Sequence, residues 1–219
     1  LNAHPHCSDD RNVVGVHNGI IENYQELREK LQNKGYTFYS DTDTEVAIKL
    51  IDYYYKKYEH TPVDAINHAM VRIRGSYALA VMFKDYPEEI YAARKDSPMI
   101  IGVADGESFV ASDVPAILKY TRSVYYIGNM EMCRLQKGKV TFYNLDGDEI
   151  EKDLVEIQWD AEAAETRKSS GNGSSGGSSG SGSQGPGQGD GPGSQNPGWE
   201  QDRNGWWYRN ADGTYPVNS

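Results

Sequence analysis

Cysteine is scarce in this chain, which holds only Cys7 and Cys133 among its 219 residues. Two cysteines so far apart do not make the disulfide framework of a small secreted protein. The composition therefore fits a reducing compartment, and we predict a cytoplasmic location for the main domain. The chain begins with Leu1 rather than Met, so we expect its natural start to lie upstream.

Basic residues and long apolar runs are also scarce. Lys and Arg number 22 against 32 Asp and Glu, which gives a formal net charge of -10, and no basic run marks a phosphate-binding face. No apolar stretch reaches the length of a membrane-spanning helix, and residues 1–6 lack the pattern of a signal peptide. We therefore expect no nucleic-acid partner and no membrane partner, although a local pocket can still bind a small anion.

Composition divides the chain into three parts. Residues 1–165 carry enough Val, Ile, Leu and Tyr for one folded domain. Residues 166–198 are predicted to be a disordered, flexible linker, because 21 of the 30 residues from 169 to 198 are Gly or Ser and no apolar face offsets the ordering of the backbone. Residues 199–219 hold two aromatic runs, 199–208 and 210–215, with Asn-Gly and Asp-Gly turn signals, and are predicted to form one small β-hairpin.

Hydrophobic periodicity predicts helices first and strands later. Helical spacing occurs at 22–33, 44–58 and 63–72, with Gly35 as a stop signal and Pro62 as a start signal. Short strand-type runs separated by turn residues are found at 13–16, 77–83, 90–94, 99–103, 108–111, 124–127, 131–136 and 139–143. Strands in series favour antiparallel sheet, so we predict an α+β fold in which helices cover the sheets as a layered sandwich.

The segment after the first predicted strand carries the clearest chemical signal. An Asn-Gly turn at Asn18 and Gly19 would direct a side-chain amide and a backbone N–H at one point, and such a pair can stabilise an oxyanion. An isolated Asn-Gly also forms a plain tight turn. Asp43 stands at the start of the helix 44–58, where its carboxylate can bind a substrate ammonium group or cap the helix. Both roles can hold together if the backbone is capped nearby and the carboxylate is turned to the substrate.

Histidine and cysteine gather near the beginning of the chain. His4, His6 and Cys7 combine imidazole and thiolate, the ligands that zinc prefers, but the paired ligands of a zinc site are missing elsewhere. We therefore predict no metal site and no cofactor. Cys7 has no identifiable base beside it that would activate it as a nucleophile, and Cys133, in an apolar run, is predicted to be a buried small side chain.

Aromatic residues gather at the other end of the chain. Their rings have the chemistry to enclose a quaternary ammonium group or to stack on a sugar, and they are equally suited to close the small core of the hairpin itself. A single hairpin is marginally stable in water, so we expect at most weak binding. The candidate ligand-binding residues are Trp199, Trp206, Trp207, Tyr208 and Tyr215.

Six motifs in the first domain resemble a known family when they are taken together and in order: Asn2–His6, His17–Tyr24, Ser40–Val46, Arg74–Ala78, Ala93–Pro98 and Ala111–Asp113. They are similar to the glutaminase domain of the glutamine:fructose-6-phosphate aminotransferases, which are class II amidotransferases. The resemblance implies an N-terminal-nucleophile fold of the αββα type. In that family a first-residue cysteine attacks the side-chain amide of glutamine, and the α-amine of the same cysteine acts as the general base.

The resemblance also implies roles for particular residues. The side-chain amide of Asn18 and the backbone N–H of Gly19 would stabilise the oxyanion, and Asp43 would hold the α-ammonium group of L-glutamine. His17 and His4 are further candidates for the same substrate-binding site, and we interpret His17 as a hydrogen-bonded positioning residue rather than an acid or base. Ammonia released from glutamine would be installed on fructose 6-phosphate by regions of the family's proteins that this sequence does not include.

The sequence departs from the family pattern at both ends. Residue 1 is Leu and the opening cysteine is missing, so we expect this chain to be inactive toward glutamine. Residues 199–219 resemble a partial repeat of a choline-binding or cell-wall-binding module, whose ligand sites normally lie between successive repeats. The alternative function is a secreted cell-surface protein in which this tail contacts choline or cell-wall glycan, the first domain is a non-catalytic scaffold and a signal peptide lies upstream. A junction of two mis-joined genes is a third interpretation.

Overall fold

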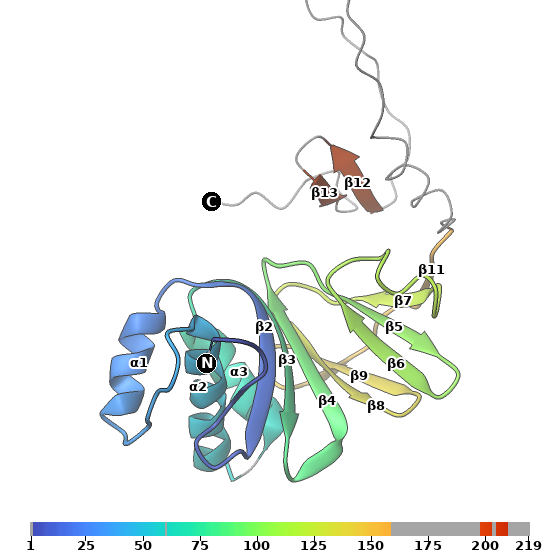
Figure 1. The fold of residues 1–219 in the computed structure, drawn as a ribbon. Helices are drawn as coiled ribbons and strands as arrows, with labels where there is room; N and C mark the ends of the chain where they lie inside the picture. Colours follow the sequence, from blue (N-terminus) through green and yellow to red (C-terminus); the bar gives the residue numbers. More distant parts are fainter. Residues whose placement is uncertain (1, 60, 159–197, 203–204, 210–219) are drawn as a thin grey trace, which may run out of the picture. The chain divides into compact units, whose positions relative to one another are not determined.

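The computed structural model describes residues 2–59, 61–158, 198–202 and 205–209. The chain divides into two compact units, Leu1–Glu165 and Thr166–Ser219, whose ribbons are drawn in Figure 1. The predicted linker at 166–198 lies outside the described residues apart from Gly198. None of the helices in the described residues has both the length and the apolar character needed to cross a membrane.

Three helices occupy the first half of the chain, α1 (Tyr24–Gln32), α2 (Asp43–Lys57) and α3 (Pro62–Arg72). The chain leaves α1 through Gly35, whose φ of 93° is the left-handed conformation that glycine adopts without strain. Pro62 occupies the first turn of α3, where its missing N–H leaves no bond unmade. The predicted helices are therefore confirmed to within a residue or two at each end.

The described strands of the first unit form two antiparallel sheets. Sheet A has the order β1-β2-β3-β4-β8-β9-β10 and sheet B has the order β11-β7-β5-β6. Three strands of only two residues, β1, β10 and β11, were not predicted, because they are too short to show a period. Sheet A consists of β1 (His6–Cys7), β2 (Val13–Ile21), β3 (Gly75–Phe83), β4 (Tyr86–Lys95), β8 (Glu131–Gln136), β9 (Lys139–Tyr143) and β10 (Glu149–Ile150). Sheet B consists of β5 (Ile100–Ala104), β6 (Glu107–Ala111), β7 (Ser123–Tyr126) and β11 (Val155–Glu156).

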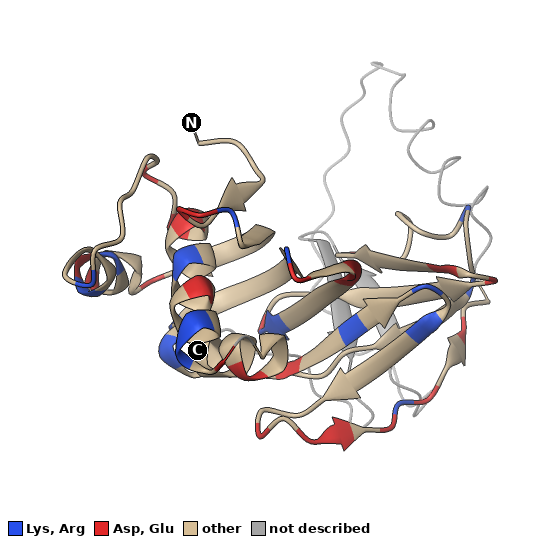
Figure 2. Cartoon of the chain, turned by 90° about the horizontal axis from the view of Figure 1, so that it is seen from below, with Lys and Arg blue, Asp and Glu red and all other residues tan. Residues whose placement is uncertain are grey.

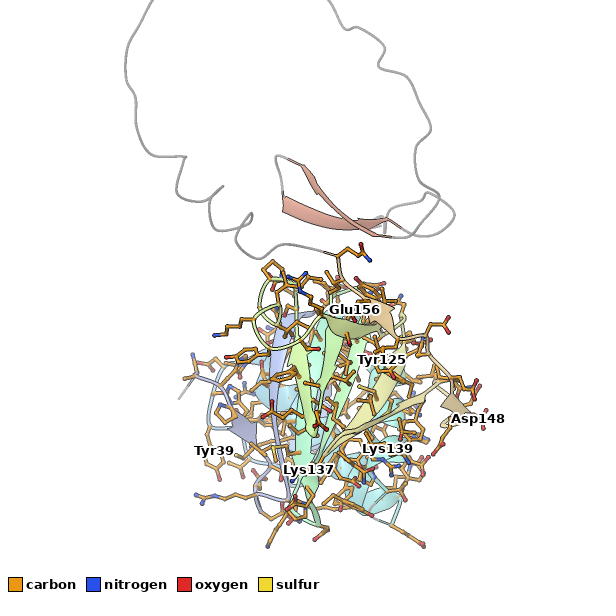
Figure 3. All side chains as sticks on the ribbon, turned by 90° about the vertical axis from the view of Figure 1, so that its right-hand side faces the viewer. Tyr39, Tyr125, Lys137, Lys139, Asp148 and Glu156 are labelled. Carbon is orange, nitrogen blue, oxygen red and sulfur yellow. The ribbon has the colours of Figure 1, made fainter. Side chains whose placement is uncertain are left out.

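The two faces of sheet A belong to two different cores. The helices cover one face, where Val13 and Ile21 of β2 are buried together with Ile48 and Ile51 of α2 (Figure 1). Sheet B packs on the other face, and the ring of Tyr125 lies 5.1 Å from that of Phe142 across the two sheets. Tyr125 is labelled among the side chains that fill this region in Figure 3. This arrangement confirms the predicted α+β layered sandwich.

The outer face of sheet B is covered by a turn-rich segment. A side chain added at Gly102 of β5 would lie 2.9 Å from both Ile117 and Thr121, so residues 113–121 pack closely on this face. Val114, Ile117 and Leu118 are buried there. In the described residues this segment, rather than a further helix, forms the fourth layer of the sandwich.

Part of the inner face of sheet A is open to solvent. Val16 and Ile20 of β2 are 40% and 68% exposed, and Met82 of β3 is 39% exposed. The register pairs Val16 with Ala80 and Ile20 with Ser76, so these residues share the face that lies opposite the helices. Asn18 lies between Val16 and Ile20 on the same face and is exposed as well.

The second unit contains one antiparallel pair, β12 (Gly198–Asp202) and β13 (Gly205–Arg209). The register places Trp199 opposite Tyr208 and Gln201 opposite Trp206. A hairpin is present as predicted, but it pairs 198–202 with 205–209, so its turn falls inside the first aromatic run. The second run, 210–215, lies outside the described residues.

Candidate functional site

Asn18 and Gly19 lie inside β2 and not in a turn after it. The strand continues to Ile21, and Asn18 and Gly19 pair with Ala78 and Tyr77 of β3. The predicted Asn-Gly turn is therefore wrong, because sheet pairing overrides the local preference of this dipeptide. Gly19 has a φ of 128°, and a Cβ at this position would lie 2.2 Å from the carbonyl oxygen of Ser76, so only glycine fits here.

Asp43 is the first residue of α2, next to the end of β2. Its Oδ2 accepts a hydrogen bond of 2.9 Å from the backbone N–H of Ile21. The helix is capped by Thr42, whose Oγ1 accepts the N–H of Glu45 at 3.2 Å. The alternative that Asp43 caps the helix is therefore wrong, and in the described residues its Oδ1 accepts no hydrogen bond.

A depression of about 450 Å³ brings the predicted site residues together. All five predicted residues of the first domain contribute to its wall, although up to 39 positions separate them in the sequence. Sequence reasoning did not select the other six residues of the wall, and only the repeated Thr in the Thr-Asp-Thr motif offered a signal for Thr42 and Thr44. The six are Ile20, Ile21, Tyr24, Asp41, Thr42 and Thr44. The wall is formed by His4, His17, Asn18, Gly19, Ile20, Ile21, Tyr24, Asp41, Thr42, Asp43 and Thr44.

His17 lies buried beside Asp43. Its Nδ1 is 3.2 Å from Oγ1 of Thr44 and 3.8 Å from Oδ1 of Asp43, and its Nε2 is buried without a hydrogen-bond partner in the described residues. Burial lowers the pKa of His17; the Asp43 carboxylate acts in the opposite direction, and His4 adds to the lowering. The imidazole is therefore neutral at pH 7, and it leaves the charge of Asp43 uncompensated.

Two further histidines contact the start of α2. Nε2 of His4 lies 3.0 Å from Oγ1 of Thr44, and Nε2 of His6 lies 3.1 Å from Oγ1 of Thr42. His4 is exposed, whereas only 6% of His6 is exposed. The two threonines that flank Asp43 are thus each bonded to a histidine from the beginning of the chain.

A buried charge network fixes the helix that carries Asp43. Nζ of Lys49, which is 0% exposed, lies 2.8 Å from Asp9 and 2.7 Å from Glu45. Burial alone would raise the pKa of Glu45, but bonds from Lys49, Ser40 and the backbone lower it to about 2. Acidic and basic residues follow one another along α2, from Glu45 through Lys49 to Lys56 (Figure 2).

Neither cysteine belongs to the wall of the depression. Cys7 is exposed on β1, and Cys133 is fully buried on β8. Burial raises the pKa of Cys133, against a smaller opposing effect of a backbone hydrogen bond with Ala92. Among the residues that the structure describes, no group of three or more His, Cys, Asp or Glu is arranged to hold a metal ion.

The remaining candidate residues lie in the second unit. Trp199 belongs to β12, and Trp206, Trp207 and Tyr208 belong to β13. Tyr215 lies outside the described residues. A second depression of about 470 Å³ contains none of the predicted residues and is lined by Asp9, Lys34, Gly35, Tyr36, Tyr53, Lys56 and Lys57.

Comparison with known sequences identifies relatives of the first unit. A family model described as a glutamine amidotransferase domain matches residues 2–119. Glutamine–fructose-6-phosphate aminotransferase from Clostridium acetobutylicum is 50% identical over 165 residues, which are 75% of this chain and 27% of that protein. The protein of the same name from Thermus thermophilus is 43% identical over 164 residues, 75% of this chain and 26% of that protein. The chain thus spans about a quarter of the length of these curated relatives.

Solved structures resemble the same region. Glutamine phosphoribosylpyrophosphate amidotransferase from B. subtilis, in complex with ADP and GMP, matches with a TM-score of 0.54 and 25% identity, over 66% of this chain and 32% of that one. A structure described as the allosteric regulatory enzyme of purine biosynthesis matches with a TM-score of 0.52 and 24% identity, over 66% of this chain and 31% of that one. The layered sandwich is therefore that of the N-terminal-nucleophile amidotransferases.

Proposed function

Because this chain belongs to the glutamine amidotransferase domain family, we propose that the depression between β2 and α2 binds L-glutamine. The observation that carries the proposal is the position of the Asp43 carboxylate beside the free edge of β2, with one oxygen bonded to Ile21 and the other without a hydrogen bond in the described residues. The chain would be the glutaminase part of a glutamine:fructose-6-phosphate aminotransferase. Fructose 6-phosphate, which also appears in the name of the relatives, would bind to regions that correspond to the rest of their length.

Asp43 is suited to hold the α-ammonium group. Its Oδ2 is used by the N–H of Ile21 at 2.9 Å, so Oδ1 remains for the ligand. The lowered pKa of His17 keeps that imidazole neutral at pH 7, so it does not neutralise the carboxylate. Charge-assisted hydrogen bonds of this kind are stronger than neutral ones and are worth about 1.5–3 kcal/mol.

The backbone of β2 is suited to hold the carboxamide end. N–H groups of alternate strand residues point to the same edge, so the N–H of Gly19 is directed toward the edge where Asp43 bonds Ile21. β1 pairs with β2 only at Val14 and Gly15, which leaves this part of the edge without a neighbouring strand in the described residues. The exposed Asn18 can add its side-chain amide to the same oxygen.

The spacing of these groups suits glutamine. Two residues along a strand span roughly 6.6–6.8 Å, and an extended glutamine places its α-nitrogen about 6 Å from its carboxamide oxygen. Asparagine is one methylene shorter, so we expect it to bind less tightly than glutamine. Length therefore favours glutamine over its nearest homologue.

Neither cysteine of this chain is suited to attack the bound amide. Cys133 is buried in the core and Cys7 lies outside the wall of the depression. We therefore assign glutamine binding without turnover to these 219 residues. Ammonia release from glutamine that disappears in Cys7→Ala would contradict this assignment.

The test compares three ligands by calorimetry or by NMR titration: L-glutamine, L-asparagine and 4-carbamoylbutanoate, which is glutamine without its α-ammonium group. We expect L-glutamine to bind most tightly. Asp43→Asn should weaken L-glutamine binding by about 10–100-fold and leave the affinity for 4-carbamoylbutanoate unchanged. Asp41→Asn is the matched control, because Asp41 lines the same depression and carries the same charge. Equal losses in the two variants would contradict the proposal.

A further inference from the structure

The segment His4-Pro5-His6 connects the two elements that form the depression. His6 belongs to β1 and pairs with Gly15 of β2, the strand that carries Asn18 and Gly19. The same segment bonds to the start of α2 through His4 and His6. It is therefore held between the strand and the helix that together form the proposed glutamine site.

Hydrogen counting fixes the direction of the bond at Thr42. The hydroxyl of Ser40 donates to Oε2 of Glu45 at 2.6 Å, so the contact of 2.9 Å between Ser40 and Thr42 must use the hydrogen of Thr42. The oxygen of Thr42 then accepts from the N–H of Glu45 and from Nε2 of His6. His6 therefore carries its proton on Nε2, and this tautomer is assigned by counting hydrogens.

The bonds at Thr44 follow the same logic. The hydroxyl of Thr44 lies 3.2 Å from Nδ1 of His17 and 3.0 Å from Nε2 of His4, and its single hydrogen can be donated to only one of them. Each threonine beside Asp43 is thus held by a hydrogen bond to a histidine.

The two histidine rings support one another. Their centroids are 5.6 Å apart and their planes meet at 85°, an edge-to-face contact that aromatic rings prefer. The two rings therefore contact the start of α2 together, one through Thr42 and the other through Thr44.

We propose that His4 and His6 are positioning residues, which hold the Thr42–Thr44 segment so that the Asp43 carboxylate stays bonded to Ile21 and directed at the ammonium group of the ligand. The ligand part of this inference rests on the function proposed above. Neither histidine is a catalytic residue, because each acts through a threonine. The positioning part stands on the contacts within the chain alone.

The first test requires no ligand. Asp43 accepts the hydrogen bond of the Ile21 amide, so loss of this bond should raise the hydrogen-exchange rate of that amide. We expect Thr44→Val, which removes the hydroxyl at nearly constant shape, to raise the exchange rate of Ile21 by about tenfold, and His4→Ala and His6→Leu to do the same. His6→Gln, which keeps a donor, should restore the wild-type rate. The amide of Ile51, in the middle of α2, reports on general unfolding and should not change. Unchanged Ile21 exchange in all three disrupting variants would overturn the proposal.

The second test measures the preference for L-glutamine over 4-carbamoylbutanoate in the same variants. We expect this preference to fall by about tenfold in Thr44→Val and His6→Leu and to recover in His6→Gln. Equal weakening of both ligands would mean a general structural role and would overturn the positioning proposal. If the wild-type chain shows no preference while Ile21 exchange responds as expected, the glutamine function fails and the positioning role stands.

Discussion

The backbone N–H of Ile21 donates a hydrogen bond of 2.9 Å to Oδ2 of Asp43, and this contact joins the end of β2 to the start of α2. A loop and a helix separate the two residues in the sequence. The bond uses one carboxylate oxygen and leaves the other toward the depression that Asn18 and Gly19 also line. One contact between backbone and side chain thus sets the geometry of the proposed site.

Gly19 should tolerate no side chain. In Gly19→Ala the new Cβ would lie 2.2 Å from the carbonyl oxygen of Ser76 at a φ of 128°. We expect a loss of more than about 1 kcal/mol in the free energy of unfolding, measured by chemical denaturation, together with loss of glutamine binding. Gly35→Ala is the control, because its φ is 93° but no heavy atom lies within 4 Å. Equal losses of unfolding free energy in Gly19→Ala and Gly35→Ala would show that the clash with Ser76 of β3 is unimportant.

Lys49 should be required for stability. Lys49→Met leaves the carboxylates of Glu45 and Asp9 without their buried cation, and breaking a buried ion pair in this way typically costs about 3–5 kcal/mol. Lys30→Met is the control, because the pair that Lys30 forms with Glu26 is exposed and such pairs contribute about 0–1 kcal/mol. Urea unfolding of both variants measures the two losses of stability. Similar unfolding midpoints would refute the prediction that Lys49 is required for stability.

Acid should unfold the domain partly through Glu45. Its pKa is about 2 in the folded chain against an ordinary value of 4.5. A lowered folded-state pKa stabilises the protein above pH 4.5, and this stabilisation is lost as the pH falls from 4.5 toward 2.

The test of this acid effect is Glu45→Gln. We expect the variant to be less stable at pH 7 and its stability to depend less on pH between pH 4.5 and 2. Thermal unfolding at a series of pH values measures this dependence. Glu29→Gln, at an exposed position of α1, should retain the full dependence. An unchanged slope in Glu45→Gln would contradict the assignment.

Glutamine binding should weaken in mild acid. The pKa of His17 lies below its ordinary value of 6.5 because of burial, so the ring is neutral at pH 7 and gains its proton only at lower pH. Protonated His17 would pair with Asp43, 3.8 Å away, and would compete with the ligand's ammonium group. The unfolded chain binds this proton more readily, so stability should also decline as the pH falls below 6.5.

Titrations at pH 7 and at a series of lower pH values check this expectation. The affinity for L-glutamine should fall, whereas that for 4-carbamoylbutanoate should stay level. His17→Asn keeps a donor near Thr44 but cannot titrate, so the pH dependence should disappear. His68→Asn, at an exposed position of α3, should leave it unchanged. A persistent pH dependence in His17→Asn would assign the effect to another group.

Local signals in the sequence predicted most of the elements. The helix predicted at 44–58 is α2 at Asp43–Lys57, and the strand predicted at 139–143 is β9 with the same bounds. These elements are predicted by hydrophobic periodicity and by the residues that start and stop helices. Both signals depend only on residues a few positions apart in the sequence. The strands β1, β10 and β11 escaped prediction because two residues are too few to show a period.

The order of its motifs by itself determined the family to which this chain is similar, and its periodicity determined the layered α+β architecture. Only the tertiary structure decided that Asn18 and Gly19 lie within a strand, that Thr42 rather than Asp43 caps α2, and that His4 and His6 contact the threonines beside Asp43. The reason is physical: helix and turn preferences act between near neighbours, whereas sheet register and hydrogen bonds across 36 and 40 positions arise only when the packed core brings those segments together.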